Sequence, residues 1–127
     1  MIVKHVSDIV GTKNEVDTPT WDSRRLIVRS DGIGFSLNHT VIKPGTETQI
    51  WYKNHVEAVY CMDGEGEIEV IGGETYPIRP GTLYVLNGHE KHLLRAKSAM
   101  TMLCVFDPPL SGTEVHDADG VYPIAQD

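Results

Sequence analysis

The stretch Arg79–His92 reads RPGTLYVLNGHEKH and encloses one short apolar run between two turn signals. The Pro80-Gly81 and Asn87-Gly88 pairs mark the turns, because proline presets one turn angle and glycine accepts the positive φ that many turns require. The run Leu83–Leu86 has the length and composition of a β-strand. Small metal-binding β-barrels often place a histidine just after such a Pro-Gly turn, whereas this chain has Tyr84 there. The stretch predicts a strand of a small barrel, with Tyr84 either an unusual metal ligand or the mark of a lost metal.

Similar turn signals recur along the chain as Asp31-Gly32, Pro44-Gly45, Asp63-Gly64 and Gly72-Gly73. The runs between them are rich in valine, isoleucine, tyrosine, threonine and leucine, at the spacing of roughly 8–12 residues that is typical of an all-β sandwich or barrel. The expected strands are Arg25–Arg29, Ile33–Ile42, Glu47–Lys53, His55–Met62, Glu65–Ile71, Glu74–Ile78, Leu83–Leu86, His92–Ala96 and Met100–Phe106.

Outside these strands, only a short turn near Ser7–Val10 suggests a helix. We predict a single domain, residues 1–127, in which an N-terminal segment precedes a jelly-roll-like barrel. Residues 108–127 hold two adjacent prolines and then polar residues, so we expect an ordered extension or a mobile lid there rather than a barrel strand.

Composition narrows the classes of partner. The 127 residues carry 11 basic and 18 acidic side chains, for a net charge of -7, which argues against nucleic acid or an anionic membrane surface as a partner. Cys61 and Cys104 both lie in apolar runs, as expected of reduced, buried thiols. No stretch resembles a signal peptide or approaches the ~20 apolar residues of a membrane helix. We therefore expect a cytoplasmic protein.

Strand alternation predicts which side chains face the barrel interior. On Ile33–Ile42, for example, Ser36, Asn38 and Thr40 share one face. If these faces point inward, the interior holds Asn38, Thr40, Tyr52, His55, Glu57, Tyr84, His92 and Cys104. Buried polar groups cost a few kcal/mol unless they have partners, so this interior is too polar for a simple packed core. It indicates a ligand cavity.

Two residue spacings resemble the motifs of the cupin superfamily. The first cupin motif is G-x5-H-x-H-x3-E-x6-G, and this chain matches its glycines and glutamate with Gly45, Glu57 and Gly64. The second, G-x5-P-x-G-x2-H-x3-N, resembles the stretch from Gly73 to Gly88. Trp51, Lys53 and Tyr84 stand where a typical cupin has histidine ligands. The resemblance implies a cupin barrel, but the spacing alone is poor evidence for a metal.

The whole chain is similar to a narrower family, the ectoine synthases. The segments that carry this resemblance are WDSRRL (Trp21–Leu26), GTET (Gly45–Thr48), NHVEAVYC (Asn54–Cys61), GEGEIE (Gly64–Glu69), PIRPGTLY (Pro77–Tyr84), CVFDPPLSGTEVHD (Cys104–Asp117) and DGVYP (Asp119–Pro123). The resemblance implies a cytoplasmic, homodimeric hydro-lyase that closes N4-acetyl-L-2,4-diaminobutyrate into the cyclic amidine ectoine, with loss of water. Ectoine is a compatible solute made under osmotic stress.

The resemblance also implies dependence on iron, with Glu57, Tyr84 and His92 as the metal ligands. A carboxylate, a phenolate and an imidazole suit Fe(II) or another divalent first-row metal better than a thiolate-preferring ion. Three protein ligands leave coordination positions open for substrate or water, as a catalytic site requires. The alternative is that Tyr84 and His92 are barrel residues with ordinary hydrogen-bond partners.

Other residues are candidates for binding and catalysis. Trp21, Asn38, Thr40, Cys104 and Phe106 are expected to shape the substrate pocket, and Arg25 to bind the substrate carboxylate; the alternative for Arg25 is a surface arginine beside Arg24. Tyr52 and His55 are candidates for proton transfer, with general acid and general base left unassigned.

In the tail, Glu114 and His116 are two residues apart, so an extended backbone points both side chains the same way, into the barrel mouth. We expect them to close over the substrate and engage its amine, in a tail that is mobile until substrate binds. The alternative for the tail is a solvated charged segment.

Two other classes of function stay open at this stage. A non-catalytic cupin that binds a small ligand without metal would explain Trp51 and Lys53, but the polar inner faces and the tail motif oppose it. A cupin dioxygenase or isomerase is the third class. A dioxygenase usually keeps more histidine ligands, and turnover without oxygen would distinguish a lyase from it.

Overall fold

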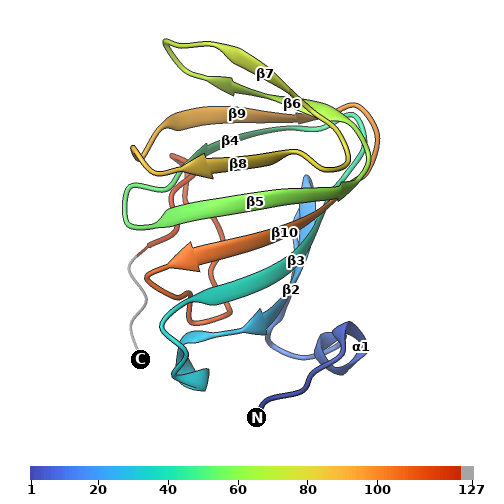
Figure 1. The fold of residues 1–127 in the computed structure, drawn as a ribbon, viewed down its shortest axis with the longest axis vertical. Coiled ribbons are helices and arrows are strands. Elements are labelled where there is room, and N and C mark those ends of the chain that lie inside the picture. Colours follow the sequence, from blue (N-terminus) through green and yellow to red (C-terminus); the bar gives the residue numbers. More distant parts are fainter. Residues whose placement is uncertain (124–127) are drawn as a thin grey trace.

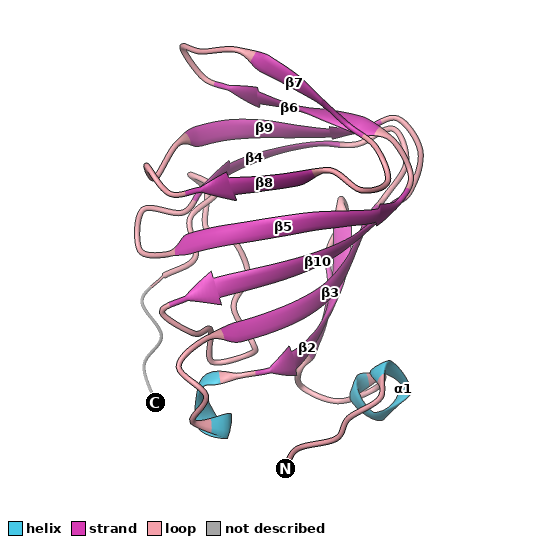
Figure 2. Ribbon diagram, viewed as in Figure 1, coloured by secondary structure: helices cyan, strands magenta, loops and turns pink. Residues whose placement is uncertain are grey.

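Strands make up nearly half of the computed structural model, which describes residues 1–123, and helices make up very little of it (Figures 1 and 2). The strands are β1 (Glu15–Asp17), β2 (Trp21–Ile27), β3 (Ser36–Ile42), β4 (Glu47–Trp51), β5 (Val56–Asp63), β6 (Gly66–Val70), β7 (Thr75–Ile78), β8 (Leu83–Leu86), β9 (Lys91–Ala96) and β10 (Met100–Asp107). A short helix, α1 (Val6–Ile9), precedes them, and Arg29–Asp31 form a single 3-10 turn. The all-β prediction is confirmed.

Two antiparallel sheets face each other, as Figure 1 shows. The larger sheet has the order β1-β2-β3-β10-β5-β8, and the smaller has the order β4-β9-β6-β7. Four antiparallel pairs are therefore nested along the chain, each inside the one before: β3–β10, β4–β9, β5–β8 and β6–β7. Successive pairs alternate between the larger and the smaller sheet. This nesting is the jelly-roll connectivity that the sequence predicted.

Strand bounds differ from the prediction mainly near the N-terminus. The strand predicted at Arg25–Arg29 begins earlier, as β2 at Trp21, and ends before the 3-10 turn. The strand predicted from Ile33 begins at Ser36, because Gly32 and Gly34 have positive φ and interrupt the extended chain. β1 was not predicted, since three residues are too few to show alternation. The Leu83–Leu86 strand has its predicted bounds.

The Pro80-Gly81 turn before β8 has the predicted chemistry. The Thr82 backbone N–H donates to the Arg79 carbonyl oxygen at 3.0 Å, which closes a four-residue turn. Gly81 has a φ of 92°, as the third residue of a type II turn requires. The turn aims β8 back along β5, where Tyr84 lies opposite Val59.

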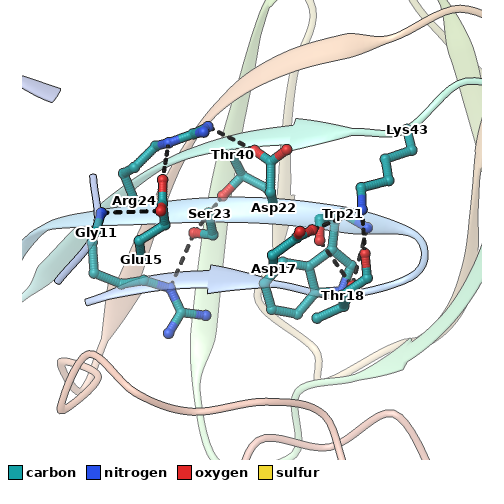
Figure 3. Close-up of polar contacts among 11 residues, drawn as sticks. Gly11, Glu15, Asp17, Thr18, Trp21, Asp22, Ser23, Arg24, Thr40 and Lys43 are labelled. Atoms are coloured by element: carbon teal, nitrogen blue, oxygen red, sulfur yellow. Dashed lines mark hydrogen bonds and ion pairs between the residues drawn. The ribbon is translucent and has the colours of Figure 1, made fainter. Parts of the chain in front are cut away.

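Side chains join the two strands of the first hairpin, β1–β2 (Figure 3). Arg24 Nε lies 3.1 Å from Glu15 Oε2, and Arg24 Nη1 lies 2.7 Å from Asp22 Oδ1. Solvent-exposed ion pairs contribute at most about 1 kcal/mol each. The turn itself is closed by Thr18, whose hydroxyl donates to the Trp21 carbonyl at 2.9 Å and accepts from the Trp21 N–H at 3.1 Å. These bonds fix Trp21 at the start of β2.

The interior is apolar at one end and polar at the other. Strand register places Met100 opposite Ile42, and both are buried. Further along β10, Cys104 lies opposite Asn38 on one side and Val59 on the other. Packing at the apolar end supplies the hydrophobic stabilisation, of roughly 1.5–3 kcal/mol per large buried side chain. The polar end is where a ligand cavity can form.

The segment after β10, drawn in red in Figure 1, runs from the β2 side of the barrel to β4. The Arg29 N–H donates to the Leu110 carbonyl at 2.7 Å, and the Trp51 N–H donates to the Gly120 carbonyl at 2.8 Å. Leu110 and Tyr122 are buried in the interior. The tail is thus an extension that bridges the two sheets, and it forms no barrel strand as far as residue 123. The rest of the predicted tail, 124–127, lies outside the described residues.

Gly64, in the first cupin-like motif, lies close to the backbone at Ala99, and substitution of this glycine tests that packing. Its φ is 87°, and a Cβ there would overlap the Ala99 carbonyl oxygen. Gly72 has a similar φ of 81° but open space around it. Gly72→Ala should cost only the left-handed strain, about 1–2 kcal/mol. Gly64→Ala should cost more than about 3 kcal/mol, because backbone atoms must move as well. Urea unfolding of both variants measures the difference, and equal losses would contradict the packing.

Candidate active site

A narrow cavity of about 30 Å³ lies between the two sheets at the polar end of the barrel. Its wall includes the predicted site residues Trp21, Asn38, Thr40, Tyr52, Glu57, Tyr84, Cys104, Phe106 and His116. It also includes Ile42, Ile50, Val59, Leu94, Met102 and Tyr122, which were not predicted as site residues. Residues from seven strands (β2, β3, β4, β5, β8, β9 and β10) and the tail therefore meet at one place, as the inner-face alternation predicted for the strands.

The remaining predicted residues, Arg25, His55, His92 and Glu114, do not form the cavity wall. All four are buried. His55 lies just before β5, where its Nδ1 donates to the Pro108 carbonyl at 2.9 Å and its Nε2 has no partner. Its ring contacts Phe106 edge-on, with 5.8 Å between ring centroids. His55 therefore supports the cavity from behind through Phe106.

The predicted metal ligand His92 has the arrangement of a ligand. Its Nδ1 lies 3.0 Å from the Glu90 carbonyl oxygen, and a carbonyl only accepts, so Nδ1 carries the proton. In a neutral imidazole, Nε2 then has the free lone pair, and this atom is buried without a partner. Burial lowers the pKa of His92, which favours the neutral ring. A hydrogen bond from the other ring nitrogen to a backbone carbonyl is the usual way a ligating histidine is oriented.

Glu57 and Tyr84 lie on neighbouring strands, β5 and β8. Burial raises the pKa of Glu57 to about 8, against a smaller lowering by the Cys104 thiol. Burial, and then the charge of Glu57, raise the pKa of Tyr84 well above its ordinary value. Both groups would become anions only with a cation beside them, so the donor set fits a divalent metal. Among residues 1–123, no group of three His, Cys, Asp or Glu side chains forms a metal site. The predicted ligand set is not a group of that kind, because one of its members is a tyrosine.

The residues at the two histidine positions of the first cupin motif face outward. Trp51 lies on the opposite side of β4 from buried Ile50, and the Lys53 and Lys91 ammonium groups each lie 5.2 Å from its ring centroid. Between Trp51 and Lys53, Tyr52 points inward and is buried. In this barrel, the first motif thus contributes its glutamate, Glu57, and the intervening Tyr52 to the cavity, and neither histidine position faces it.

An aromatic cluster closes the polar end of the cavity. The Tyr52 ring lies 5.1 Å from Phe106 and 5.0 Å from Tyr122, and His116 stacks on Tyr122 at 4.4 Å, measured between ring centroids. The Tyr52 hydroxyl and His116 Nε2 are 2.9 Å apart. Tyr122 is central here, yet no residue pattern predicted it, because the tail has no strand alternation. The only signal was its place in the string DGVYP.

Both members of the Tyr52–His116 pair are neutral at neutral pH. Burial, followed by the charges of Tyr122 and Glu57, raises the pKa of Tyr52 well above its ordinary value. Burial, followed by the positive charges of Arg25 and His92, lowers the pKa of His116 to about 4. The tyrosine therefore keeps its proton and the imidazole has a free lone pair, which is the state needed to pass a proton between them.

Arg25 lies beneath the tail. Its guanidinium is fully buried and donates to the carbonyl oxygens of Gly112 and Glu114, each at 3.0 Å, and to the Tyr122 hydroxyl at 3.3 Å. Its Nε donates to the Ser23 hydroxyl, which also accepts from Thr40 at 2.9 Å (Figure 3). The alternative of a surface arginine is wrong. Arg25 ties the tail to the barrel wall, and its contact with a substrate carboxylate stays a prediction.

The direction of the Glu114 side chain contradicts the prediction that two tail side chains, Glu114 and His116, point together into the barrel mouth. Its carboxylate folds back and accepts from the backbone N–H groups of Ser111, Gly112 and Thr113, and from the Ser111 hydroxyl, at 2.7–3.1 Å. Only His116 reaches the cavity wall. The alternation of an extended chain does not apply, because these four donors hold residues 111–114 in a loop.

Fold and site together define a cupin barrel with a small-molecule site. A cupin-2 domain protein from Rhodospirillum rubrum has the same fold, with a TM-score of 0.61 and 22% identity over 69% of this chain and 60% of that one. In residues 1–123, no helix is long and apolar enough to cross a membrane.

The similarity to one cupin family is much closer. A family model described as ectoine synthase matches residues 1–126. A crystal structure of ectoine synthase from P. lautus has a TM-score of 0.89 and 67% identity, and covers 98% of this chain and 94% of that chain. L-ectoine synthase from Desulfatibacillum aliphaticivorans is 56% identical over 130 residues, and the match covers all of both proteins. L-ectoine synthase from Oceanobacillus iheyensis is 57% identical over 98% of each.

The chain belongs to the ectoine synthase family. The predictions of a cupin fold and of an enzyme of the hydro-lyase class are thereby confirmed.

The Glu114 loop gives a pH-dependent test of how the tail is held. Burial raises the pKa of Glu114, but the hydrogen bonds from residues 111–113 outweigh it, so its pKa lies below the ordinary 4.5. A lowered folded pKa stabilises the protein above pH 4.5, and this stability is lost as pH falls through the folded value. At pH 7, Glu114→Gln should lose about 1–3 kcal/mol, and the difference from the parent should shrink below pH 4.5.

Urea unfolding across this pH range measures the effect. Exposed Glu74 supplies the matched control, because Glu74→Gln should change stability by less than about 0.5 kcal/mol at either pH. A constant difference between parent and Glu114→Gln at all pH values would contradict the role of the carboxylate.

Proposed function

We propose that the chain closes N4-acetyl-L-2,4-diaminobutyrate into ectoine, with loss of water. Membership of the ectoine synthase family supports the reaction class. The observation that carries the proposal is the narrow cavity between the sheets, in which a cluster of buried acids faces a neutral tyrosine–histidine pair. Ectoine is a compatible solute, so the enzyme would act in the response to osmotic stress. Two buried thiols without a disulfide, Cys61 and Cys104, agree with the proposed cytoplasmic location.

Glu57, Tyr84 and His92 are the proposed ligands of Fe(II) or another divalent first-row metal. His92 offers an unpartnered Nε2, and Glu57 and Tyr84 offer oxygen atoms whose negative charge needs a cation. Bound there, such a cation would supply Lewis-acid chemistry for the acetyl carbonyl oxygen of the substrate.

The Tyr52–His116 pair is proposed to move the protons of the reaction. The substrate amine must lose a proton as it attacks the amide carbon, and the carbonyl oxygen must gain protons to leave as water. Tyr52 holds a proton at its hydroxyl oxygen, 2.9 Å from His116 Nε2, and both groups lie on the cavity wall. His55 and Glu114 support this pair from behind, through Phe106 and the tail loop.

The other wall residues are proposed to hold the flexible substrate folded. Asn38 Oδ1 is buried and has no hydrogen-bond partner, so an N–H of the substrate would satisfy it. Trp21, Thr40, Cys104 and Phe106 supply the mostly apolar wall around it. Arg25 remains our proposal for the substrate carboxylate once the tail moves. Orientation of this kind can be worth on the order of 7–11 kcal/mol.

The small volume of the cavity supports the lid proposal for the tail. Ligand pockets usually measure about 300–1,000 Å³, whereas this cavity measures about 30 Å³. A groove of about 380 Å³ lies outside it and shares Trp21 and His116 with the inner wall. The groove is formed by residues from 18–20, 48–49 and 115–120. Movement of the tail would join the two spaces, admit the substrate and then exclude water from the reaction.

The proposed ligands can be tested one by one. Glu57→Ala, Tyr84→Ala and His92→Ala should each lose bound iron and cyclisation activity while the circular dichroism spectrum stays that of the parent. Lys53→Ala is the matched control, because Lys53 occupies a usual cupin ligand position but faces outward. It should keep the parental iron content. Anaerobic incubation of the parent with Fe(II) and the substrate should yield the cyclic product. A requirement for oxygen would favour a dioxygenase instead.

The proton-transfer pair predicts a different pattern of loss. Tyr52→Phe and His116→Ala should lower turnover by about 10²–10⁴-fold, since each removes one partner of the transfer. Iron content should stay near the parental value in both, because neither side chain is a proposed ligand. Iron content and turnover are measured on the same preparation. If either variant loses its iron, it belongs to the coordination shell and the ligand set is wrong.

We also propose a homodimer, as the family resemblance implied. β8 is an edge strand of the larger sheet, with an unpaired side. Its outward side chains Leu83 and Val85 are exposed, and Tyr60 and Met62 on neighbouring β5 extend this apolar surface. A second copy of the chain is the occupant we propose for it.

Light scattering after size-exclusion chromatography tests the dimer. The parent should elute with the mass of two chains, and Leu83→Lys combined with Val85→Lys should shift it to one chain, because two lysines would be desolvated at the contact. A parental protein that is monomeric at working concentration would refute the dimer. A double variant that stays dimeric would place the contact elsewhere.

A further inference from the structure

The loop between β8 and β9 contains an exposed residue in a strained conformation. His89 has a φ of 55° and is the one non-glycine residue with positive φ in residues 1–123. A left-handed backbone costs a residue with a Cβ roughly 1–2 kcal/mol. Gly88, which would tolerate that conformation freely, comes one position earlier and does not adopt it. Such strain at an exposed position calls for a contact that compensates for it.

His89 makes that contact with the backbone of Tyr52. Its Nδ1 lies 2.9 Å from the Tyr52 carbonyl oxygen, and because a carbonyl only accepts, Nδ1 is the donor. In return, the Trp51 indole N–H donates to the His89 carbonyl at 3.1 Å. These two bonds join the chain segment after β4 to the β8–β9 loop.

Tyr52 depends on this anchor because it lies beyond the sheet ladder. β4 ends at Trp51, whose partner on β9 is Lys91, so the ladder pairs no residue with Tyr52. The Tyr52 hydroxyl must nevertheless meet His116 Nε2 at 2.9 Å. Functional groups need their backbone fixed to within about 0.5 Å, and an anchor outside the ladder is required for that.

We infer that His89 is a positioning residue that holds Tyr52 in line with His116 for proton transfer. His89 does not line the cavity itself, and its ring contacts the site through the hydrogen bond to the Tyr52 carbonyl. The inference rests on the proposed function, because it assigns Tyr52 to proton transfer. The simpler alternative is that His89 only stabilises its own loop.

Three substitutions separate these two roles. Asparagine and aspartate both adopt left-handed backbone readily, and each places a polar atom at the δ position that Nδ1 occupies in histidine. Asparagine can present an N–H to the Tyr52 carbonyl, whereas ionised aspartate presents only acceptor oxygens. His89→Asn is thus the matched control for His89→Asp. His89→Gly removes the ring while relieving the backbone strain, so it should not destabilise the loop through its backbone.

The experiment measures kcat, KM, iron content and the urea midpoint of the parent and the three variants. His89→Asp and His89→Gly should lower kcat on the order of ten- to a hundredfold, because a small displacement of a catalytic group has that effect. KM, iron content and the midpoint should stay near the parental values. His89→Asn should retain kcat within about threefold. Loop stabilisation alone would move the midpoint and leave kcat unchanged.

A second readout does not depend on turnover. The NMR signals of the Tyr52 ring, assigned with the Tyr52→Phe variant, should shift or broaden in His89→Asp and His89→Gly and keep their positions in His89→Asn. Parental kcat in the aspartate and glycine variants, or unchanged ring signals, would overturn the inference and leave the proposed function intact. A parental protein that does not cyclise the substrate would refute the proposed function, and the ring signals would still decide whether His89 holds Tyr52.

Discussion

The site depends on one buried cation, the Arg25 guanidinium. It has no carboxylate partner among its contacts and instead donates to two tail carbonyls, a tyrosine hydroxyl and a serine hydroxyl. A buried charge is stable only when its hydrogen-bonding capacity is met, so the tail must lie where these acceptors can reach it. The same contacts carry His116 and Tyr122 into the cavity wall. The guanidinium therefore holds the tail residues of the cavity wall in place, although it does not line the cavity itself.

Several weak acids lie together in the cavity, and the ionisation of one disfavours the ionisation of the others. Burial raises the pKa of Glu57, Tyr52, Tyr84 and Cys104, and the charge of Glu57 adds to the effect on the other three. Arg25 partly offsets this for Cys104 and Tyr122. A set of acids that cannot ionise together is stabilised by a cation placed among them. Glu57 and Tyr84, two of the three proposed ligands, are among these acids.

Residues on strands could be predicted from the sequence, whereas on the tail only His116 was placed correctly. Alternation along β3, β5 and β10 placed Asn38, Glu57 and Cys104 inside, because pairing in a two-sided sheet leaves each side chain only two directions. Glu114 was placed wrongly, since its direction follows from four hydrogen bonds within its own loop rather than from alternation. Tyr122 and the role of Arg25 depend on how the tail crosses the barrel, and that path follows from contacts between residues about ninety positions apart.

The burial of Arg25 also decides how the site responds to ionic strength. At 0.15 M salt, charges in water are screened beyond about 8 Å, and the surface cluster of Arg95 with Glu47, Glu67 and Glu69 is open to that screening. Arg25 is fully buried, and its partners are neutral carbonyl and hydroxyl groups, so mobile ions have little access to these bonds. As salt accumulates around the molecule, its outer ion pairs weaken while the geometry of the cavity wall is preserved.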